Sequence, residues 1–196
     1  QIAETYWLVP GLSKVVVGAP GALGTDQALA VLRAHPAVLY AEPDYVVRPH
    51  ITPNDPSFGL LYGMKNTGQS IGGVTGTPGA DIRADQAWDI LTGDPNFVIA
   101  DIDTGMQVAH PDLAANVWVN PGEIPGNGID DDSNGYIDDI NGWDFWDRDA
   151  TPQDSGSHGT HTGGTIGAVG NNGIGVAGVA WSCKIMVLKF LGPSGG

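Results

Sequence analysis

The stretch Phe-Val-Ile-Ala-Asp-Ile-Asp-Thr-Gly, residues 97–105, decides the fold. Its first four residues are a continuous apolar run, which is typical of a parallel strand covered on both faces. The run delivers Asp103 at its carboxyl end, where Thr104 and Gly105 turn the chain. Ligands of open α/β sheets bind beyond the carboxyl ends of the strands. The stretch therefore predicts a central strand that carries an aspartate to a functional edge.

The residues downstream predict a helix and a second strand. Residues 158–169 are typical of a helix, although their many glycines lower helix stability unless other backbone segments approach closely. Residues 185–191 predict a second core strand, and residues 84–91 predict a short helix that carries Trp88. Strand, helix and strand form a βαβ pattern, so the predicted fold class is α/β with a parallel, doubly wound sheet.

Composition narrows the class of protein. The 196 residues, with 41% hydrophobic residues and 6 Trp, are enough for one globular domain plus a small appendage. A net charge of −14 argues against binding to nucleic acid, which depends on Lys and Arg. No apolar run approaches the roughly 18 residues that a membrane span needs, so no membrane partner is expected. The single cysteine, Cys183, is expected to be a small buried hydrophobe.

The chain divides near residue 50. Residues 48–57 contain three prolines and no apolar periodicity, which predicts an exposed connector. The part before it is expected to be a small α+β unit with a helix at 28–34 that residues 25–27 cap. Its strands are expected at 14–17, 38–41 and 45–47.

Asp103 and His158 are the candidate catalytic residues. An imidazole at the start of a helix can act as a general base if a carboxylate fixes its tautomer. The motifs around both residues, together with His-Pro-Asp-Leu at 110–113 and His-Gly-Thr-His at 158–161, closely resemble the subtilisin-like serine proteases, or subtilases. The resemblance covers roughly residues 51–196. It implies a subtilisin-like sheet and peptide-bond hydrolysis, with Asp103 as the triad aspartate, His158 as the general base and His161 as a structural neighbour.

The resemblance also places the rest of the catalytic machinery. The family's nucleophilic serine and its oxyanion-hole asparagine would follow Gly196, while Ser155 and Ser157 flank His158 too closely to replace the serine. Triad members act as a unit, so the polypeptide alone is expected to be inactive unless a Ser-bearing partner chain completes it. The resemblance further implies that Leu191, Gly195 and Gly196 begin an edge strand that pairs with peptide substrates.

Residues 35–47 resemble the end of a subtilase inhibitory propeptide. The resemblance implies that residues 1–50 are part of a propeptide that inhibits in cis, and that residues 51–196 are the N-terminal part of the peptidase domain. Maturation is then expected between Val47 and Asp55, in a secreted zymogen of bacterial, thermitase-like type. An ordinary small α+β domain remains the alternative for residues 1–50.

An acidic loop at residues 130–138 suggests a metal site. Its pattern is the first half of an EF-hand-like calcium loop, in which alternate oxygen ligands converge on one cation and a glycine permits the sharp turn. Asn141 stands where such a loop has its bidentate Glu, and a solvated acidic turn is the alternative. The candidate Ca²⁺ ligands are the side chains of Asp130, Asp132 and Asn134, the carbonyl of Tyr136, and Asp138 directly or through water.

A second calcium site is implied by the family resemblance alone. Its ligands would be the side chains of Asp55, Asp112 and Asn172 with the carbonyls of Ile174 and Val176.

Asp101 departs from the family, which usually has an apolar residue at this position. Strand alternation places it on the same side as Asp103, where two carboxylates would oppose each other's ionisation. A structural, hydrogen-bonded aspartate is the expected role.

Two other functions were weighed. Residues 173–178 fit the dinucleotide pattern G-x-G-x-x-G, but they follow a helix and precede a strand, which is the reverse of the order that pattern requires. A non-catalytic calcium-binding module would be supported by the acidic loop alone, and the Asp103 and His158 motifs weigh against it.

Overall fold

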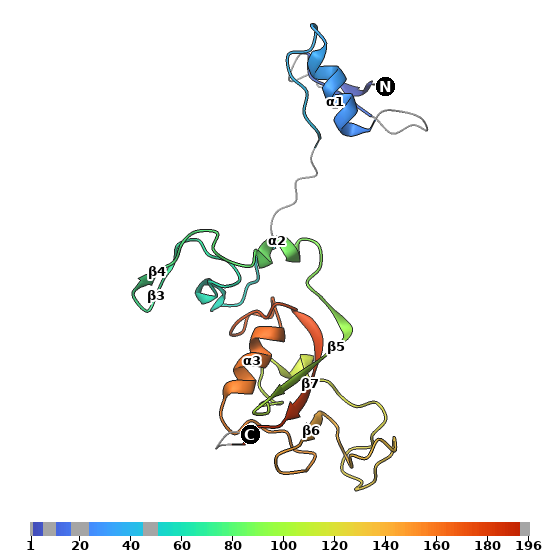
Figure 1. The fold of residues 1–196 in the computed structure, drawn as a ribbon, viewed down its shortest axis with the longest axis vertical. Coiled ribbons are helices and arrows are strands. Elements are labelled where there is room, and N and C mark those ends of the chain that lie inside the picture. The colour runs from blue at the N-terminus through green and yellow to red at the C-terminus, as the bar shows by residue number, and fades with distance from the viewer. Residues whose placement is uncertain (1, 6–10, 17–23, 45–50, 193–196) are drawn as a thin grey trace. The chain divides into compact units, whose positions relative to one another are not determined.

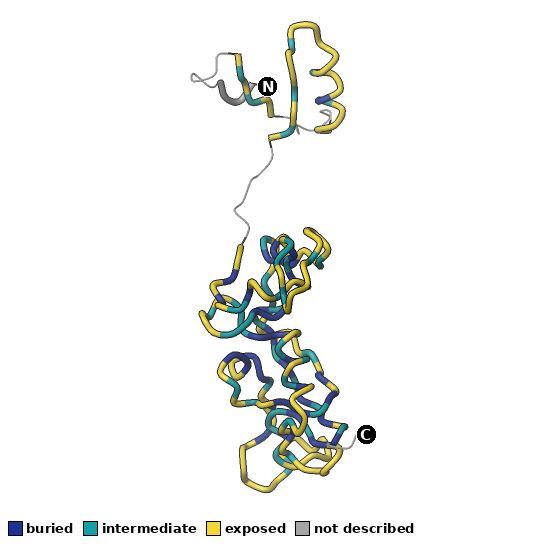
Figure 2. The backbone as a smooth tube through the Cα atoms, turned by 90° about the vertical axis from the view of Figure 1, so that its left-hand side faces the viewer, coloured by how far each residue is buried: buried dark blue, intermediate teal, exposed yellow. Residues whose placement is uncertain are grey.

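The computed structural model describes residues 2–5, 11–16, 24–44 and 51–192, which belong to two units (Figure 1). One unit comprises residues 1–48 and the other residues 49–196. Buried segments are concentrated in the second unit, whereas the described part of the first is mostly exposed (Figure 2). The positions that carry chemistry in the sequence all fall in the second unit.

The first unit contains a two-stranded antiparallel sheet and a helix. Strand β1 (Ile2–Thr5) pairs with β2 (Ser13–Val15), and helix α1 (Thr25–Ala34) follows. The helix begins before the predicted residue 28, because the Gly24 amide donates to the Gln27 side chain and closes the first turn. Leu29 is its buried residue.

Two expected strands of this unit have different outcomes. The strand predicted at 38–41 is wrong: Leu39 and Tyr40 are exposed, and the Val38 amide donates to the His35 carbonyl in a turn. Apolar residues at these positions therefore face solvent instead of a partner strand. The strand predicted at 45–47 lies outside the described residues.

The second unit begins with short elements and then forms the main sheet. The short elements are η1 (Phe58–Leu60), β3 (Ser70–Ile71), β4 (Val74–Thr75), α2 (Ala84–Trp88) and η2 (Ala114–Asn116). Helix α2 ends three residues before the predicted Leu91. The main sheet and its helix are β5 (Gly93–Asp103), β6 (Gly142–Asp144), α3 (His158–Gly167) and β7 (Ser182–Lys189).

The three main strands are parallel and lie in the order β5-β7-β6, which confirms the predicted α/β class with a parallel sheet. Strand β5 ends on Asp103, as its apolar run predicted. Asp103 lies opposite Lys189 in the register, and Asp101 lies opposite Val187. Neighbouring residues of parallel strands share a face, so both aspartates lie on the face that carries the core residue Val187.

Helix α3 covers that face, and glycines allow it to lie close to the sheet. Gly159, Gly163 and Gly167 are spaced by four residues, so they form one stripe of the helix. A Cβ at Gly159 would lie 2.1 Å from the Gly105 carbonyl oxygen, and one at Gly167 would lie 2.6 Å from Cys183 Sγ. The close backbone approach expected from the sequence therefore accounts for the glycines.

Two apolar clusters stabilise the unit. The first lies between α3 and the sheet and consists of Met106, Leu113, Val117, Ala168, Cys183, Ile185 and Val187. The second consists of Phe58, Met64, Ala84, Trp88, Ala177 and Trp181. Cys183 is 1% exposed and packs as the expected buried hydrophobe.

The expectation that β5 is covered on both faces is wrong for the described residues. Val98 and Ile102 point to the face opposite α3, and both are exposed. No helix in the described part of the chain has the length and apolar character needed to cross a membrane.

Candidate active site and metal centres

The end of β5 and the start of α3 bring Asp103 and His158 together. His158 is the first residue of α3, and its Nδ1 lies 2.7 Å from Oδ1 and 2.8 Å from Oδ2 of Asp103. Gly159 makes this approach possible, because a Cβ at this position would lie only 3.2 Å from the Asp103 Cβ. A strand end, a helix start and one glycine therefore position the pair.

Asp103 is held in a fixed orientation. Its carboxylate accepts hydrogen bonds from the Thr104 amide at 2.6 Å and from the Thr162 hydroxyl at 3.2 Å. Burial raises the pKa of Asp103, but the hydrogen bonds from His158 and Thr104 outweigh burial and hold the pKa below its ordinary value. The carboxylate is therefore ionised at neutral pH.

His158 is poised as a base. The hydrogen bond to Asp103, followed by the negative charge of that carboxylate, raises the pKa of His158. The His158 side chain is 73% exposed, whereas that of Asp103 is 11% exposed. One ring nitrogen is thus occupied by a buried carboxylate while most of the ring remains open, which is the arrangement that a general base needs.

Asp154 connects the two segments that carry the pair. Its Oδ1 accepts from the Thr104 hydroxyl at 2.9 Å and from the amides of Gly156 and Ser157, both at 2.8 Å. Its Oδ2 accepts from the amide and the hydroxyl of Thr160. Burial raises the pKa of Asp154, but the hydrogen bonds from Thr160 and Gly156 outweigh burial and lower it. One carboxylate thus ties the turn after Asp103 to the first turn of α3.

Sequence reasoning missed Asp154, although a signal was present. An aspartate just before a helix start can cap the free amides of the first turn. Asp154 precedes His158 by four residues, and Ser-Gly-Ser lies between them.

Asp101 lies two residues before Asp103 and is 5% exposed. Burial and the neighbouring Asp103 raise the pKa of Asp101 to about 6. Its Oδ2 has no hydrogen-bond partner among the described residues, so the expectation of a fully hydrogen-bonded structural aspartate is wrong for that oxygen.

No described serine completes the pair. The amides of Ser155 and Ser157 donate to the Thr104 carbonyl and to Asp154, and neither hydroxyl is hydrogen-bonded to His158. Leu191 follows β7, and its amide lies 3.4 Å from the Asp103 carbonyl oxygen. Leu191 is therefore close to Asp103, whereas Gly195 and Gly196 lie outside the described residues.

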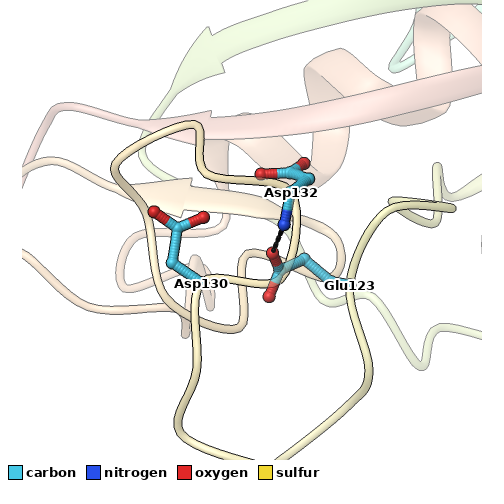
Figure 3. Close-up of side chains that lie close together, drawn as sticks. All are labelled: Glu123, Asp130 and Asp132. Carbon is cyan, nitrogen blue, oxygen red and sulfur yellow. Dashed lines mark hydrogen bonds between the residues drawn. The ribbon is translucent and has the colours of Figure 1, made fainter.

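The acidic loop brings three carboxylates together. Glu123, Asp130 and Asp132 each offer an oxygen within 4.8 Å of the others (Figure 3). Asn134 sits beside them, because its amide donates to Asp130 and Asp132, both at 3.0 Å. Converging carboxylate oxygens are the ligands that Ca²⁺ prefers. Asp130, Asp132 and Asn134 thus lie together as their spacing predicted.

Glu123 is the member of this cluster that the sequence did not reveal. It is buried, and its carboxylate accepts from the amides of Asp131, Asp132 and Asp138 at 2.9, 3.2 and 3.0 Å. Glu123 lies seven residues before the loop, and no pattern in the sequence connects the two.

Asp138 does not join the cluster. Its carboxylate accepts from the amides of Gly126, Asn127 and Gly128 at 2.8, 3.2 and 3.0 Å, which closes the neighbouring turn. The Tyr136 ring packs on Trp143, with ring centroids 4.9 Å apart.

The residues of the second predicted metal site also converge. Asp55 accepts from the amides of Asn171 and Asn172 at 2.6 and 3.3 Å, and Asp112 accepts from the Asn172 side chain at 2.8 Å. Asp112 also accepts from the Val176 amide at 2.9 Å, and the Ile174 amide donates to the Asn172 side chain. Asp55 and Asp112 are 4% and 2% exposed, and within the described part of the chain neither forms an ion pair.

Residues 94–196, just over half of the chain, match the family described as the subtilase family. The chain is 44% identical over 112 residues to "Subtilisin-like protease 1" of Plasmodium vivax, which covers 56% of this chain and 18% of that protein. It is 33% identical over 171 residues to "Thermophilic serine proteinase" of Bacillus sp. (strain AK1), covering 87% and 33% of the two chains. It is 37% identical over 145 residues to "Thermitase" of Thermoactinomyces vulgaris, covering 74% and 38%.

A solved structure supports the fold. The Aeromonas sobria serine protease, determined in complex with a chaperone, aligns with a TM-score of 0.52 and 24% identity over 73% of this chain and 21% of that chain. The chain spans no more than 38% of the length of any of these relatives.

Proposed function

This chain belongs to the subtilase family, and from that premise we propose that it is the N-terminal part of a serine endopeptidase that hydrolyses peptide bonds. Asp103 and His158 are two members of the triad, and a serine outside the described residues is the third. The observation that carries the proposal is the 2.7 Å contact between His158 Nδ1 and Asp103 Oδ1, combined with the open side of the imidazole ring.

The roles follow from this geometry. Asp103 accepts a hydrogen bond from the Nδ1–H group of His158, which leaves Nε2 as the basic nitrogen. That nitrogen takes the proton of the serine hydroxyl during attack on the peptide carbonyl and returns it to the leaving amine. The buried Asp103 carboxylate stabilises the imidazolium that forms between the two steps.

The serine and the oxyanion-hole donor come from sequence after residue 196 or from a separate Ser-bearing chain. An extended peptide substrate pairs with the chain at Leu191, and the other two expected substrate contacts, Gly195 and Gly196, lie outside the described residues. The support is the position of Leu191 two residues after the end of β7, where its amide lies 3.4 Å from the Asp103 carbonyl oxygen.

Labelling with a fluorophosphonate serine reagent tests this assignment and separates it from a non-catalytic calcium-binding module. The sample is the complete protein, or this chain together with its Ser-bearing partner, in the presence of Ca²⁺. We expect labelling of one serine, and we expect it to disappear in His158→Ala and to persist in His161→Ala. A folded sample without any labelled serine would contradict the proposal.

Residues 1–50 act as an inhibitory propeptide of this enzyme. The first compact unit ends within the Pro-rich connector, and the Bacillus relative matches 87% of the chain, so its similarity reaches into this unit. Incubation with the active enzyme followed by N-terminal sequencing should find a cut between residues 47 and 55, and activity should rise with the cut. An uncut connector in an active sample would refute the assignment.

The acidic loop binds Ca²⁺ through Glu123, Asp130, Asp132 and Asn134. Three carboxylates without a cation among them repel one another, and a divalent ion would offset that repulsion. The neighbouring Tyr136 and Trp143 allow a direct test, because aromatic rings close to bound Tb³⁺ sensitise its emission. Asp130→Asn should reduce the emission and Ca²⁺ should compete with it.

Asp131→Asn is the matched control for this site. It removes the same charge from the same loop, but the Asp131 carboxylate is turned toward the Ile124 amide and the Asn127 side chain. Equal losses of Tb³⁺ emission in both variants would contradict a localised site.

The second calcium site involves Asp55, Asp112, Asn172 and the carbonyls of Ile174 and Val176. Two buried carboxylates that form no ion pair with any described residue need a compensating cation, because an unpaired buried charge is costly. Calorimetric titration should show one Ca²⁺ site fewer in Asp112→Asn than in the matched Asp85→Asn, whose buried carboxylate pairs with Lys65. An unchanged stoichiometry would remove this site from the proposal.

We infer secretion from family membership alone. Detection of the mature protein in the culture medium of its source would support it, and retention inside the cell would refute it.

A further inference from the structure

Asp101 is a buried carboxyl that the proposed chemistry does not use. It lies on the α3 side of β5, as Asp103 does, and it is 5% exposed. A Cβ at Gly163 of α3 would lie 3.5 Å from its Oδ2, so the helix backbone passes directly over the carboxyl. Buried polar atoms without a partner are rare in native proteins, and the unpartnered Oδ2 therefore requires an explanation.

The charged groups around Asp101 all belong to the catalytic region. Asp103 follows it on β5, His158 begins α3, and Asp154 comes from the segment before that helix. Lys189 of β7 is the nearby base, but its ammonium group pairs with Asp144 at 2.5 Å and with Asp147 at 3.2 Å. His161 lies two residues beyond Gly159 and so points away from the sheet. No described cation other than His158 is thus left to interact with Asp101.

We propose that Asp101 is a positioning residue that tunes the charge of the Asp103–His158 pair: its ionisation beneath the pair stabilises the protonated form of His158. The identification of His158 as the general base rests on the proposed function. The tuning itself is a property of the three side chains and does not depend on proteolysis.

The electrostatics support this coupling. Burial and Asp103 raise the pKa of Asp101 to about 6, and the charge of His158 acts in the opposite direction. The hydrogen bond to Asp103 makes the largest contribution to the raised pKa of His158, and Asp101 adds to the rise by its charge. The ionisation of Asp101 and the protonation of His158 therefore favour each other. As the pH rises through about 6, Asp101 becomes charged and holds the proton on His158 to higher pH.

The test is an NMR titration of the His158 ring in the 196-residue chain, with the signal assigned through His158→Ala. Asp101→Asn and Asp101→Val remove the charge, and both relieve the burial of an unpartnered carboxylate, so they should fold. Asp85→Asn removes an equally buried carboxylate from α2 and is the matched control. Asp103→Asn is the positive control, because it tests whether the titration detects the loss of a neighbouring carboxylate.

We expect the titration midpoint of His158 to fall by roughly half a pH unit in both Asp101 variants. The loss of one nearby charge in a partly buried site shifts a pKa by an amount of this order. The midpoint in Asp85→Asn should equal that of the unmodified chain. A midpoint unchanged in both Asp101 variants while Asp103→Asn shifts it would overturn the proposal and leave Asp101 with a structural role.

A kinetic measurement separates this inference from the proposed function. In the active protein, the acidic limb of the kcat/KM profile should move to lower pH in Asp101→Asn by the same amount as the NMR midpoint. A shifted midpoint, combined with no peptidase activity in the complete protein that carries the serine, would uphold the tuning and refute the protease. An active protease whose midpoint and profile do not move would refute the tuning alone.

Discussion

The Asp103–His158 site and the acidic loop at residues 130–138 are both built from carboxylates, but only the first contains its own counter-charge. Asp103 is held by an imidazole, a hydroxyl and an amide that come from β5 and α3. Glu123, Asp130 and Asp132 are held by backbone amides and an asparagine, without a described base. The first site therefore has its charges balanced by its own side chains, whereas the second gathers three carboxylates that no described base offsets.

The two regions use different parts of the fold. The Asp103–His158 pair depends on a fixed distance between two side chains, which a strand end and a helix start provide. In the acidic loop, several oxygen atoms point toward one position. An irregular segment can provide this arrangement because its backbone turns sharply, with φ of 59° at Ser133 and 97° at Gly135.

The largest effect is expected at the catalytic pair. Asp103→Asn keeps the shape of the side chain but leaves His158 without an anionic partner, so kcat should fall by about 10⁴-fold. The unfolding temperature should change little, because the hydrogen bonds of the carboxamide replace some of those lost. Asp94→Asn, at the exposed start of β5, is the control, and a similar loss of kcat there would contradict the role given to Asp103.

The next effect is expected on removal of calcium. Each ion bound at 100 times its Kd contributes about 3 kcal/mol, so excess EGTA should lower the melting temperature by about 5–10 °C per site. The Asp103–His158 pair should be insensitive to EGTA before the protein unfolds, as its NMR signals would report. An unchanged melting temperature would show that the acidic loop needs no cation, and the two regions would then not differ in this respect.

A smaller effect of opposite sign is expected at Asp101. The pKa of Asp101 is raised in the folded state to about 6, so its protonated form contributes stability that is complete below the unfolded value near 3.9 and is lost as the pH rises through about 6. Asp101→Asn should therefore raise the free energy of unfolding at pH 7 by up to about 3 kcal/mol. The gain should vanish below about pH 4. Urea denaturation at both pH values measures this, and a gain of equal size at both would argue against a titrating carboxyl.

The smallest effect is expected at Asp154. Asp154→Asn weakens the cap of α3 and the bond to Thr104, which should cost about 1 kcal/mol of stability. Because Thr104 follows Asp103, the pair should lose alignment, and kcat should fall by about tenfold while KM changes little. The control is Asp149→Asn, whose carboxylate accepts from the Thr151 amide in the same segment. Equal kinetics for the two variants would deny Asp154 a positioning role.

Much of the fold could be predicted because the main elements have local signals. The apolar run before Asp103 predicted β5. Residues 158–169 predicted a helix, and their many glycines predicted that other backbone segments approach it closely. The strand Ile2–Thr5, which pairs with residues 13–15, was not predicted. The strand expected at 38–41 is absent because a turn between Val38 and His35 overrides the apolar pattern.

In the candidate sites, residues close together in sequence could be predicted to lie together, whereas residues from separate segments could not. Asp130, Asp132 and Asn134 lie within one turn, so their spacing was sufficient to predict that they converge. Glu123 enters from another segment, and Asp138 turns toward amides of a third. The unpartnered oxygen of Asp101 was equally hidden, because only the tertiary structure shows how the backbone of α3 covers it.

If His158, held by Asp103, is the general base of a serine endopeptidase, its loss must abolish most of the turnover. We would compare kcat for peptide hydrolysis in the complete protein with kcat in His158→Ala and His161→Ala. We expect a loss of about 10⁴- to 10⁶-fold for His158→Ala and near-normal turnover for His161→Ala. A His158→Ala protein that retains most of its turnover while folded would contradict it.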